Sequence, residues 1–191
     1  MARKKTTTMD SLIKAAENGD AGAQNDLAIA FYGGNGVEQD LQKAAFWLRK
    51  AAEQGHPEAQ CNLGTFYYTG SGVTKNVRTA TTWWRKAAEQ GFSEAQNRLG
   101  NCYYNGEGVK QDFNKAAKLF TDAANQGHAW AQNNLAKCYM EGTGVEQDRE
   151  RAVNLFIIAL MGGIDEAAWN LMTMGVDENE IRLRLMSMNL Q

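Results

Sequence analysis

The sequence predicts an all-α solenoid built from 36-residue helix–turn–helix repeats, and three observations support this. Segments that open with Ala-Gln recur at a fixed period of 36 residues with no insertion, a period typical of repeat arrays. Each copy carries an apolar stripe at helical spacing, for example at Leu99, Cys102 and Tyr103. The chain has one proline against 19 glycines and is rich in helix-forming residues. The four full copies begin at Ala23, Ala59, Ala95 and Ala131.

Each copy divides into two helices. In the first copy the stripe ends at Gly34 and Gly36, because glycine adopts the left-handed backbone of a helix C-cap without steric cost. Asp40 follows and is a good N-cap residue for a second helix that contains Trp47 and ends before Gly55. The equivalent caps in the later copies are Asn76, Asp112 and Asp148.

The repeat pattern also divides the chain. The predicted order is a flexible basic N-terminus at 1–8, a half repeat at 9–22, full repeats at 23–58, 59–94, 95–130 and 131–166, a partial repeat at 167–174, and a C-terminal capping helix at 175–191. The second helix of the fourth repeat carries Ile157 and Ile158 where earlier copies have Arg-Lys, so we expect another element to cover it. That element is either the capping helix or a homodimer partner, and the sequence leaves both open.

Long motifs in the repeats closely resemble the Sel-1-like repeat (SLR) family, a relative of the tetratricopeptide repeats. "AQNRLGNCYYNGEGVKQD" and "ATTWWRKAAEQG" carry the resemblance, which covers roughly residues 12–174. It implies a right-handed α/α superhelical solenoid and a non-catalytic protein-binding scaffold. Bacterial relatives of this kind act as regulatory scaffolds, host-interaction factors or toxin-neutralising immunity proteins, and the sequence does not choose among these roles.

Cysteine-rich relatives, described as β-lactamase-like hydrolases, supply the alternative function. Their paired cysteines join the two helices of one repeat. Here Cys102 and Cys138 lie one full period apart, beyond the reach of a disulfide, and Cys61 occupies another face. We therefore expect reduced thiols, a cytoplasmic location and no enzymatic activity.

By analogy with tetratricopeptide repeats, the first helices should line a concave groove that binds a partner protein or peptide. The expected exposed groove residues occupy the third, fourth, seventh, tenth and eleventh positions of the repeats. Asparagine amides suit a peptide main chain, tyrosines give flat contact area, and Arg98 with Lys137 could clamp a carboxylate of an acidic partner. The candidates are Asn25, Tyr32, Asn62, Tyr68, Asn97, Arg98, Asn101, Tyr104, Asn133, Asn134 and Lys137.

Other chemistry is sparse in the sequence. The two histidines, His56 and His128, occupy equivalent positions two periods apart, so we expect no catalytic, cofactor or metal site. The net charge of -2 and pI of about 5.8 favour neither nucleic acid nor an anionic membrane. The second helices give the first half of the chain a basic face, on which we expect no interleaved aromatic residues.

Overall fold

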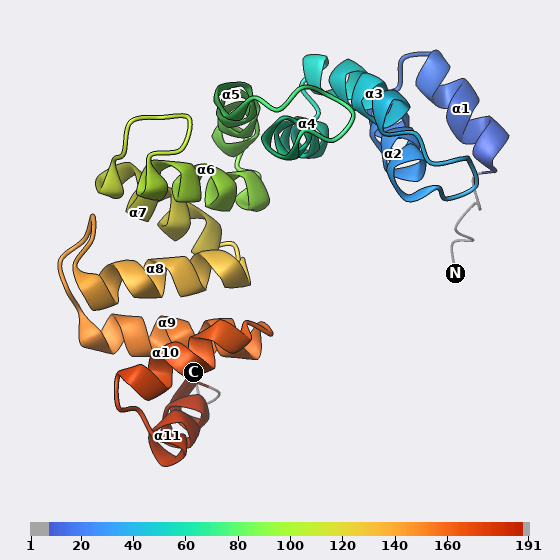
Figure 1. The fold of residues 1–191 in the computed structure, drawn as a ribbon. Helices are drawn as coiled ribbons and strands as arrows, with labels where there is room; N and C mark the ends of the chain where they lie inside the picture. Colours follow the sequence, from blue (N-terminus) through green and yellow to red (C-terminus); the bar gives the residue numbers. More distant parts are fainter. Residues whose placement is uncertain (1–7, 189–191) are drawn as a thin grey trace. The chain divides into compact units, whose positions relative to one another are not determined.

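The protein is described by a computed structural model that covers residues 8–188, in which eleven α-helices and no strands occur (Figure 1). The all-α prediction is confirmed. Apart from Thr8, which caps α1, the predicted flexible N-terminus lies outside the described residues. The helices are α1 (Met9–Glu17), α2 (Ala21–Gly33), α3 (Leu41–Glu53), α4 (Pro57–Thr69), α5 (Val77–Glu89), α6 (Ser93–Asn105), α7 (Phe113–Ala124), α8 (Ala129–Glu141), α9 (Arg149–Met161), α10 (Asp165–Thr173) and α11 (Glu178–Met188).

The predicted caps begin and end the helices. Asp40 accepts hydrogen bonds from the backbone N–H groups of Gln42 and Lys43 at the start of α3. Asn76, Asp112 and Asp148 each accept one such bond at the starts of α5, α7 and α9. Gly34 ends α2 in the left-handed conformation, with φ of 70°. These contacts satisfy backbone groups that a helix end leaves without intrahelical partners.

Two compact units make up the chain, residues 1–92 and 93–191. In the N-terminal unit, α2, α3 and α4 enclose a cluster of alanines with Leu48, Leu63 and Phe66. In the C-terminal unit, Phe120 fills the space between α7 and α8, and Phe156 lies in the cluster formed by α8, α9, α10 and the residues next to α11. Each cluster spans consecutive repeats, so neighbouring hairpins cover one another's apolar surface.

The second glycine of the turn is required by a close backbone approach. At Gly72 a Cβ atom would lie 2.1 Å from the carbonyl oxygen of Leu41, one repeat earlier. At Gly144 it would lie 2.1 Å from the carbonyl oxygen of Phe113. These glycines therefore let each turn contact the start of the preceding second helix.

The repeated glutamine joins consecutive helices in the same way in successive copies. Gln60 is buried, donates from Nε2 to the carbonyl oxygen of Ala52 at 3.1 Å, and accepts at Oε1 from Gln90 at 2.8 Å. Gln24 makes the equivalent pair of bonds with Ala16 and Gln54. The Ala-Gln motif is thus a buried hydrogen-bonding device between hairpins.

The last helix packs against α9. Asp177 caps α11 as the sequence indicates, and Ile181 and Leu185 contact the Phe156 cluster. Arg184 donates to both carboxylate oxygens of Glu150, at 2.6 and 3.2 Å, and to Glu180. The side chain of Met188, expected on the same face, lies outside the described residues. Ile157 is 1% exposed, whereas its neighbour Ile158 remains 37% exposed.

Candidate functional site

The first helices α2, α4, α6, α8 and α10 carry the expected partner-binding positions, which we call the first-helix surface. The expectation of exposure is wrong for Asn25, Asn97 and Asn133, which are 2%, 7% and 0% exposed. These asparagines occupy the third position of their repeats. In each case the side chain faces the first helix of the following repeat, which belongs to the same unit. Cys61 holds that position in the second repeat and is also buried, and this apolar residue was the available sequence signal.

The buried asparagines are bonded to the fourth position of the following repeat. Asn62 Nδ2 donates to Asn25 Oδ1 at 3.4 Å in the N-terminal unit. In the C-terminal unit, Asn134 Nδ2 donates to Asn97 Oδ1 at 2.9 Å. The pair Asn170 and Asn133 repeats the contact at 3.4 Å. The ladder gives the Oδ1 atoms of Asn25, Asn97 and Asn133 a donor each, whereas Asn133 Nδ2 is buried with no hydrogen-bond partner among the described residues.

Arg98 and Lys137 do not form an open carboxylate clamp. Arg98 Nε lies 2.6 Å from Glu94 Oε1, one turn earlier on α6. Lys137 Nζ is paired with Glu166 at the start of α10. Each cation already has a carboxylate of its own unit, so neither is open as expected, and the clamp for an acidic partner stays a prediction.

The tyrosines differ in accessibility. Tyr32 is 53% exposed and its ring tilts against Phe66, with centroids 5.6 Å apart. Tyr68 is half-buried against Trp84 at 5.4 Å. Tyr104 is half-buried and meets Phe113 edge-on at 5.2 Å. Tyr32 and Tyr68 belong to the N-terminal unit and Tyr104 to the C-terminal unit.

A cleft of about 170 Å³ lies between α6 and α8 in the C-terminal unit. Its wall includes four predicted residues, Asn101, Tyr104, Asn134 and Lys137, together with Asn105 and Phe120. Phe120 is 1% exposed and gives the cleft an apolar floor. We call this feature the α6–α8 cleft. It is where the structure concentrates the candidate residues of this unit.

Glu141 is hydrogen-bonded to a residue of the cleft wall and was missed as a site residue by the sequence analysis. Tyr104 Oη donates to Glu141 Oε2 at 2.7 Å, and Thr143 Oγ1 lies 3.5 Å from the same oxygen. Burial, followed by this bond to a carboxylate, raises the pKa of Tyr104. The signal in the sequence was the difference between copies, which have Gly33, Thr69 and Asn105 at the position of Glu141.

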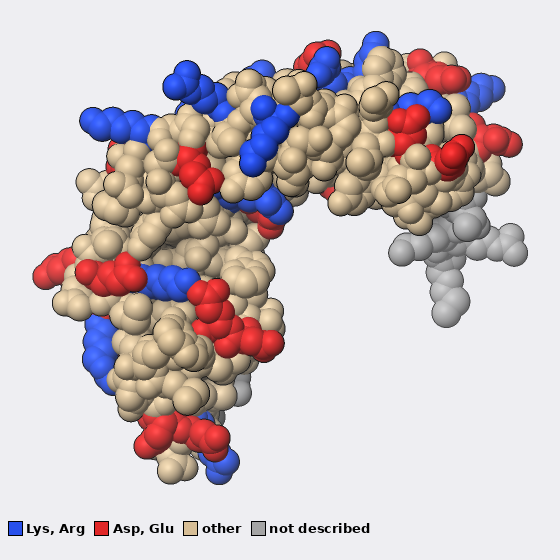
Figure 2. Space-filling view, viewed as in Figure 1, with Lys and Arg blue, Asp and Glu red and all other residues tan. Residues whose placement is uncertain are grey.

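Acidic and basic side chains alternate along α6 and α8 and form ion pairs with one another. Figure 2 shows a row over α8 in which a basic side chain has acidic side chains on both sides. Glu94 contacts Arg98 and also His128, whose Nε2 lies 2.8 Å from Glu94 Oε2. The hydrogen bond with His128, followed by the charge of Arg98, lowers the pKa of Glu94. Glu94 is therefore ionised at neutral pH.

The histidines and cysteines have structural surroundings. His56 and His128 cap α4 and α8, each accepting at Nδ1 from a backbone N–H at 3.2 Å. Cys61, Cys102 and Cys138 are buried, and none of them forms a disulfide. Burial raises the pKa of Cys102 to about 12 and that of Cys138 to about 11. Within residues 8–188, no cluster of three or more His, Cys, Asp or Glu residues is placed to hold a metal ion.

The basic face of α3 and α5 corrects another expectation, because aromatic rings do interleave with its cations. Lys86 Nζ lies 4.3 Å from the centre of the Trp83 ring, and Lys50 Nζ lies 5.6 Å from the centre of the Phe46 ring. The rings are thus covered by lysines of their own helices through cation–π contacts. The expectation that this face does not bind nucleic acid stays a prediction.

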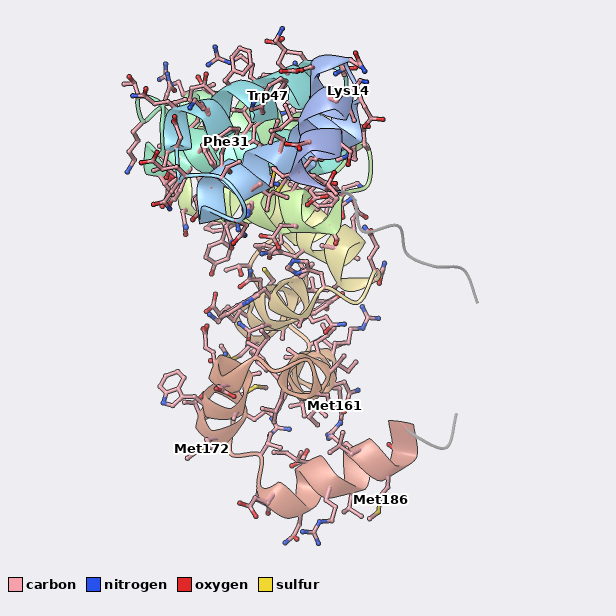
Figure 3. The ribbon with its side chains drawn as sticks, turned by 90° about the vertical axis from the view of Figure 1, so that its right-hand side faces the viewer. Lys14, Phe31, Trp47, Met161, Met172 and Met186 are labelled. Atoms are coloured by element: carbon pink, nitrogen blue, oxygen red, sulfur yellow. The ribbon has the colours of Figure 1, made fainter. Side chains whose placement is uncertain are left out.

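Several apolar side chains of the C-terminal unit are exposed. Met161 is 62% exposed, Trp169 65% and Met172 73%. Figure 3 labels Met161, Met172 and Met186, which lie on three different helices and are spread over the unit. The capping role of α11 and a homodimer contact here are compatible with this arrangement, so both remain predictions.

Comparison with known proteins places these features in a family. The model for the Sel1 repeat matches residues 21–56, 57–92, 93–128 and 131–164. No curated protein sequence matches the chain. Within the described residues, no helix is long and apolar enough to cross a membrane.

Several solved structures resemble the chain. A protective antigen of uropathogenic Escherichia coli with an SLR fold is 33% identical with a TM-score of 0.84, over 94% of this chain and 40% of that one. A Sel1 repeat protein from Oxalobacter formigenes is 37% identical with a TM-score of 0.78, over 86% and 48%. An immunity protein from Pseudomonas aeruginosa is 27% identical with a TM-score of 0.56, over 83% and 59%. The chain thus spans less than half the length of the first two.

Proposed function

The chain belongs to the Sel1 repeat family, and from that premise we propose that it is a non-catalytic scaffold that binds a partner protein at the α6–α8 cleft. Sel1 repeat proteins generally mediate protein–protein interactions. The observation that carries the proposal is the convergence of Asn101, Tyr104, Asn134 and Lys137 on one cleft with an apolar floor. A few polar groups around an apolar surface are the usual composition of a protein-binding site.

The cleft is small for other ligands. Its volume of about 170 Å³ lies below the roughly 300–1,000 Å³ of typical small-molecule sites. A protein segment needs only to place one side chain and part of its main chain there while its remaining surface contacts neighbouring helices. This geometry supports a partner protein over a cofactor.

The biological role that best fits is neutralisation or regulation of one partner protein. A structural neighbour from Pseudomonas aeruginosa is named as an immunity protein, which supports this role. The three buried cysteines, none of which forms a disulfide, support a reducing, cytoplasmic location. We propose no hydrolase activity, because the thiols are buried and their pKa values are raised, which suppresses the reactive thiolate.

A capture experiment tests the proposal. The wild-type chain and an Asn101→Ala/Tyr104→Ala variant are immobilised, and proteins retained from an extract of the native organism are identified by mass spectrometry. The retained protein is then purified and its affinity measured. We expect at least tenfold weaker binding by the cleft variant. Lys118→Ala, an exposed change on α7, serves as the control and should bind like wild type. Equal affinity of cleft variant and wild type would remove the cleft from the proposal.

A further inference from the structure

We propose that the α6–α8 cleft selects an extended peptide segment bearing an arginine or lysine, whose main chain is bound by Asn101 and Asn134 and whose cation is bound by Glu141. This inference rests on the proposed function and names the chemistry of its partner. It reverses the sequence-based expectation of an acidic partner. Two independent observations support it: the unused hydrogen-bonding groups of the two asparagines, and the lack of a cationic partner for Glu141 among the described residues.

In the pair formed by Asn101 and Asn134, one amide nitrogen and one amide oxygen make no hydrogen bond among the described residues. Asn134 Nδ2 donates to Asn97 Oδ1 at 2.9 Å and to Asn101 Oδ1 at 3.2 Å, so both of its N–H groups are committed. Within residues 8–188, the structure gives no hydrogen bond to Asn101 Nδ2 or to Asn134 Oδ1. Both residues line the cleft. An N–H donor beside a carbonyl acceptor matches the C=O and N–H of a peptide main chain.

This pair is also held in one orientation. Because Asn134 Nδ2 donates twice, turning its amide over would place Asn134 Oδ1 against two other acceptors, the Oδ1 atoms of Asn97 and Asn101. Asn97 is 7% exposed and fixes the inner end of the network. The free donor and acceptor are therefore presented before a ligand arrives, which lowers the entropic cost of binding.

Next to the cleft, the carboxylate of Glu141 has no cationic partner among the described residues. Lys137 is paired with Glu166, and Arg98 with Glu94, so these two pairs are close to neutral together. Glu141 receives hydrogen bonds only from the neutral hydroxyls of Tyr104 and Thr143 among the described residues. Burying an acidic partner side chain beside it would be repulsive, whereas an arginine or lysine would supply the missing counter-charge.

The position of Glu141 makes this preference specific to one place in the repeat array. The equivalent residues are Gly33, Thr69 and Asn105, none of which carries a charge. The bond from Tyr104 holds the carboxylate at the edge of the cleft. The recurring residues therefore build the hairpin, while the residue that differs sets the ligand preference.

Peptide selection tests the inference. A random twelve-residue peptide library displayed on phage is selected against the immobilised wild-type chain, against Glu141→Gln, and against Glu178→Gln. Glu178 is an exposed acid on α11 and gives a matched change of charge away from the cleft. Selected peptides are synthesised with fluorescein, and their affinities are measured by fluorescence polarisation.

We expect wild type and Glu178→Gln to enrich Arg or Lys at one fixed position, and Glu141→Gln to lose that enrichment. The basic peptides should bind Glu141→Gln about three- to fivefold more weakly, the effect of one partly exposed ion pair. Lys137→Ala should bind them more tightly than wild type, because Glu166 is then left unpaired beside the cleft.

The remaining outcomes overturn the inference in distinguishable ways. Peptides enriched in Asp or Glu, or peptides without charge preference that still lose affinity in Asn101→Ala, would refute the basic ligand and leave the proposed function standing. If no peptide binds the wild type better than Asn101→Ala/Tyr104→Ala, both the ligand chemistry and the binding role of the cleft fail.

Discussion

Tyr104 on α6 and Glu141 on α8 are joined by a 2.7 Å hydrogen bond from the tyrosine hydroxyl to the carboxylate, one repeat apart. The bond links the first helices of consecutive repeats at the edge of the α6–α8 cleft. It also places a carboxylate, which the other repeats lack at this position, against Tyr104, a residue that lines the cleft together with Asn101 and Asn134. We therefore expect changes at this pair to affect both the stability of the fold and the proposed binding at the cleft.

Removing either partner should reveal this coupling. We expect Tyr104→Phe and Glu141→Ala each to lower the free energy of unfolding by about 0.5–1.5 kcal/mol, the usual net value of a hydrogen bond. The double variant should lose less than the sum of the two, because both changes break the same bond. Urea denaturation of the four proteins measures the coupling, and strictly additive losses would show that the bond contributes nothing.

The asparagine ladder should matter for stability more than the exposed tyrosine. Asn97→Ala removes the acceptor of a buried 2.9 Å bond, and we expect a loss of roughly 1–3 kcal/mol. Tyr32→Ala, at a side chain that is 53% exposed, should cost less, about 1 kcal/mol or below. Thermal or urea unfolding compares the two. An equal or smaller effect for Asn97→Ala would restore it to a surface role.

Two left-handed glycines provide a matched test of the close turn. Gly144→Ala combines the strain of φ of 73° with a Cβ placed 2.1 Å from the carbonyl oxygen of Phe113. Gly163→Ala has a similar φ of 85°, but its Cβ would meet nothing within 4 Å. We expect about 1 kcal/mol of destabilisation at Gly163 and clearly more at Gly144. Similar losses at both sites would show that the turn moves away at little cost.

The contact of α11 with α9 should depend on Arg184. We expect Arg184→Met to increase hydrogen exchange in α11 selectively, because the bonds to Glu150 and Glu180 are lost. Arg184 lowers the pKa of Glu150, so its contribution is present above the ordinary carboxyl pKa and declines as the pH falls through the lowered value. Hydrogen exchange at pH 7 and pH 4 checks both statements. Unchanged exchange in the variant would assign the packing of α11 to Ile181 and Leu185 alone.

The buried thiols predict a loss of stability at alkaline pH. The pKa values of Cys102 and Cys138 are raised from 9.0 to about 12 and about 11, because burial disfavours the thiolate. Their contribution is complete below the unfolded value near 9 and is lost as the pH rises toward the folded values. Cys102→Ala/Cys138→Ala should therefore show a flatter decline between pH 8 and 10.5 in urea denaturation. A decline as steep as that of wild type would assign the effect to other groups.

Sequence periodicity was sufficient for the architecture. The period, the apolar stripe and the glycine pairs predicted the all-α fold, and Asp40, Asn76, Asp112, Asp148 and Asp177 cap the helices that they were expected to cap. These features are local, because a cap or a turn is decided by residues within a few positions of one another. Four cleft residues were also among the predicted candidates.

The sequence by itself determined the repeat, the helices and the family, whereas only the tertiary structure decided which polar residues are free to bind. Asn97 and Asn101 lie one turn apart on α6, yet Asn97 is buried and Asn101 lines the cleft. Lys137 looks like an unpaired cation in the sequence, and packing gives it Glu166 on the next first helix, whereas Arg98 is paired with Glu94 one turn earlier on its own helix. Exposure and the pairing of Lys137 depend on the neighbouring repeat, about 36 residues away, and the local pattern contains no information about its orientation.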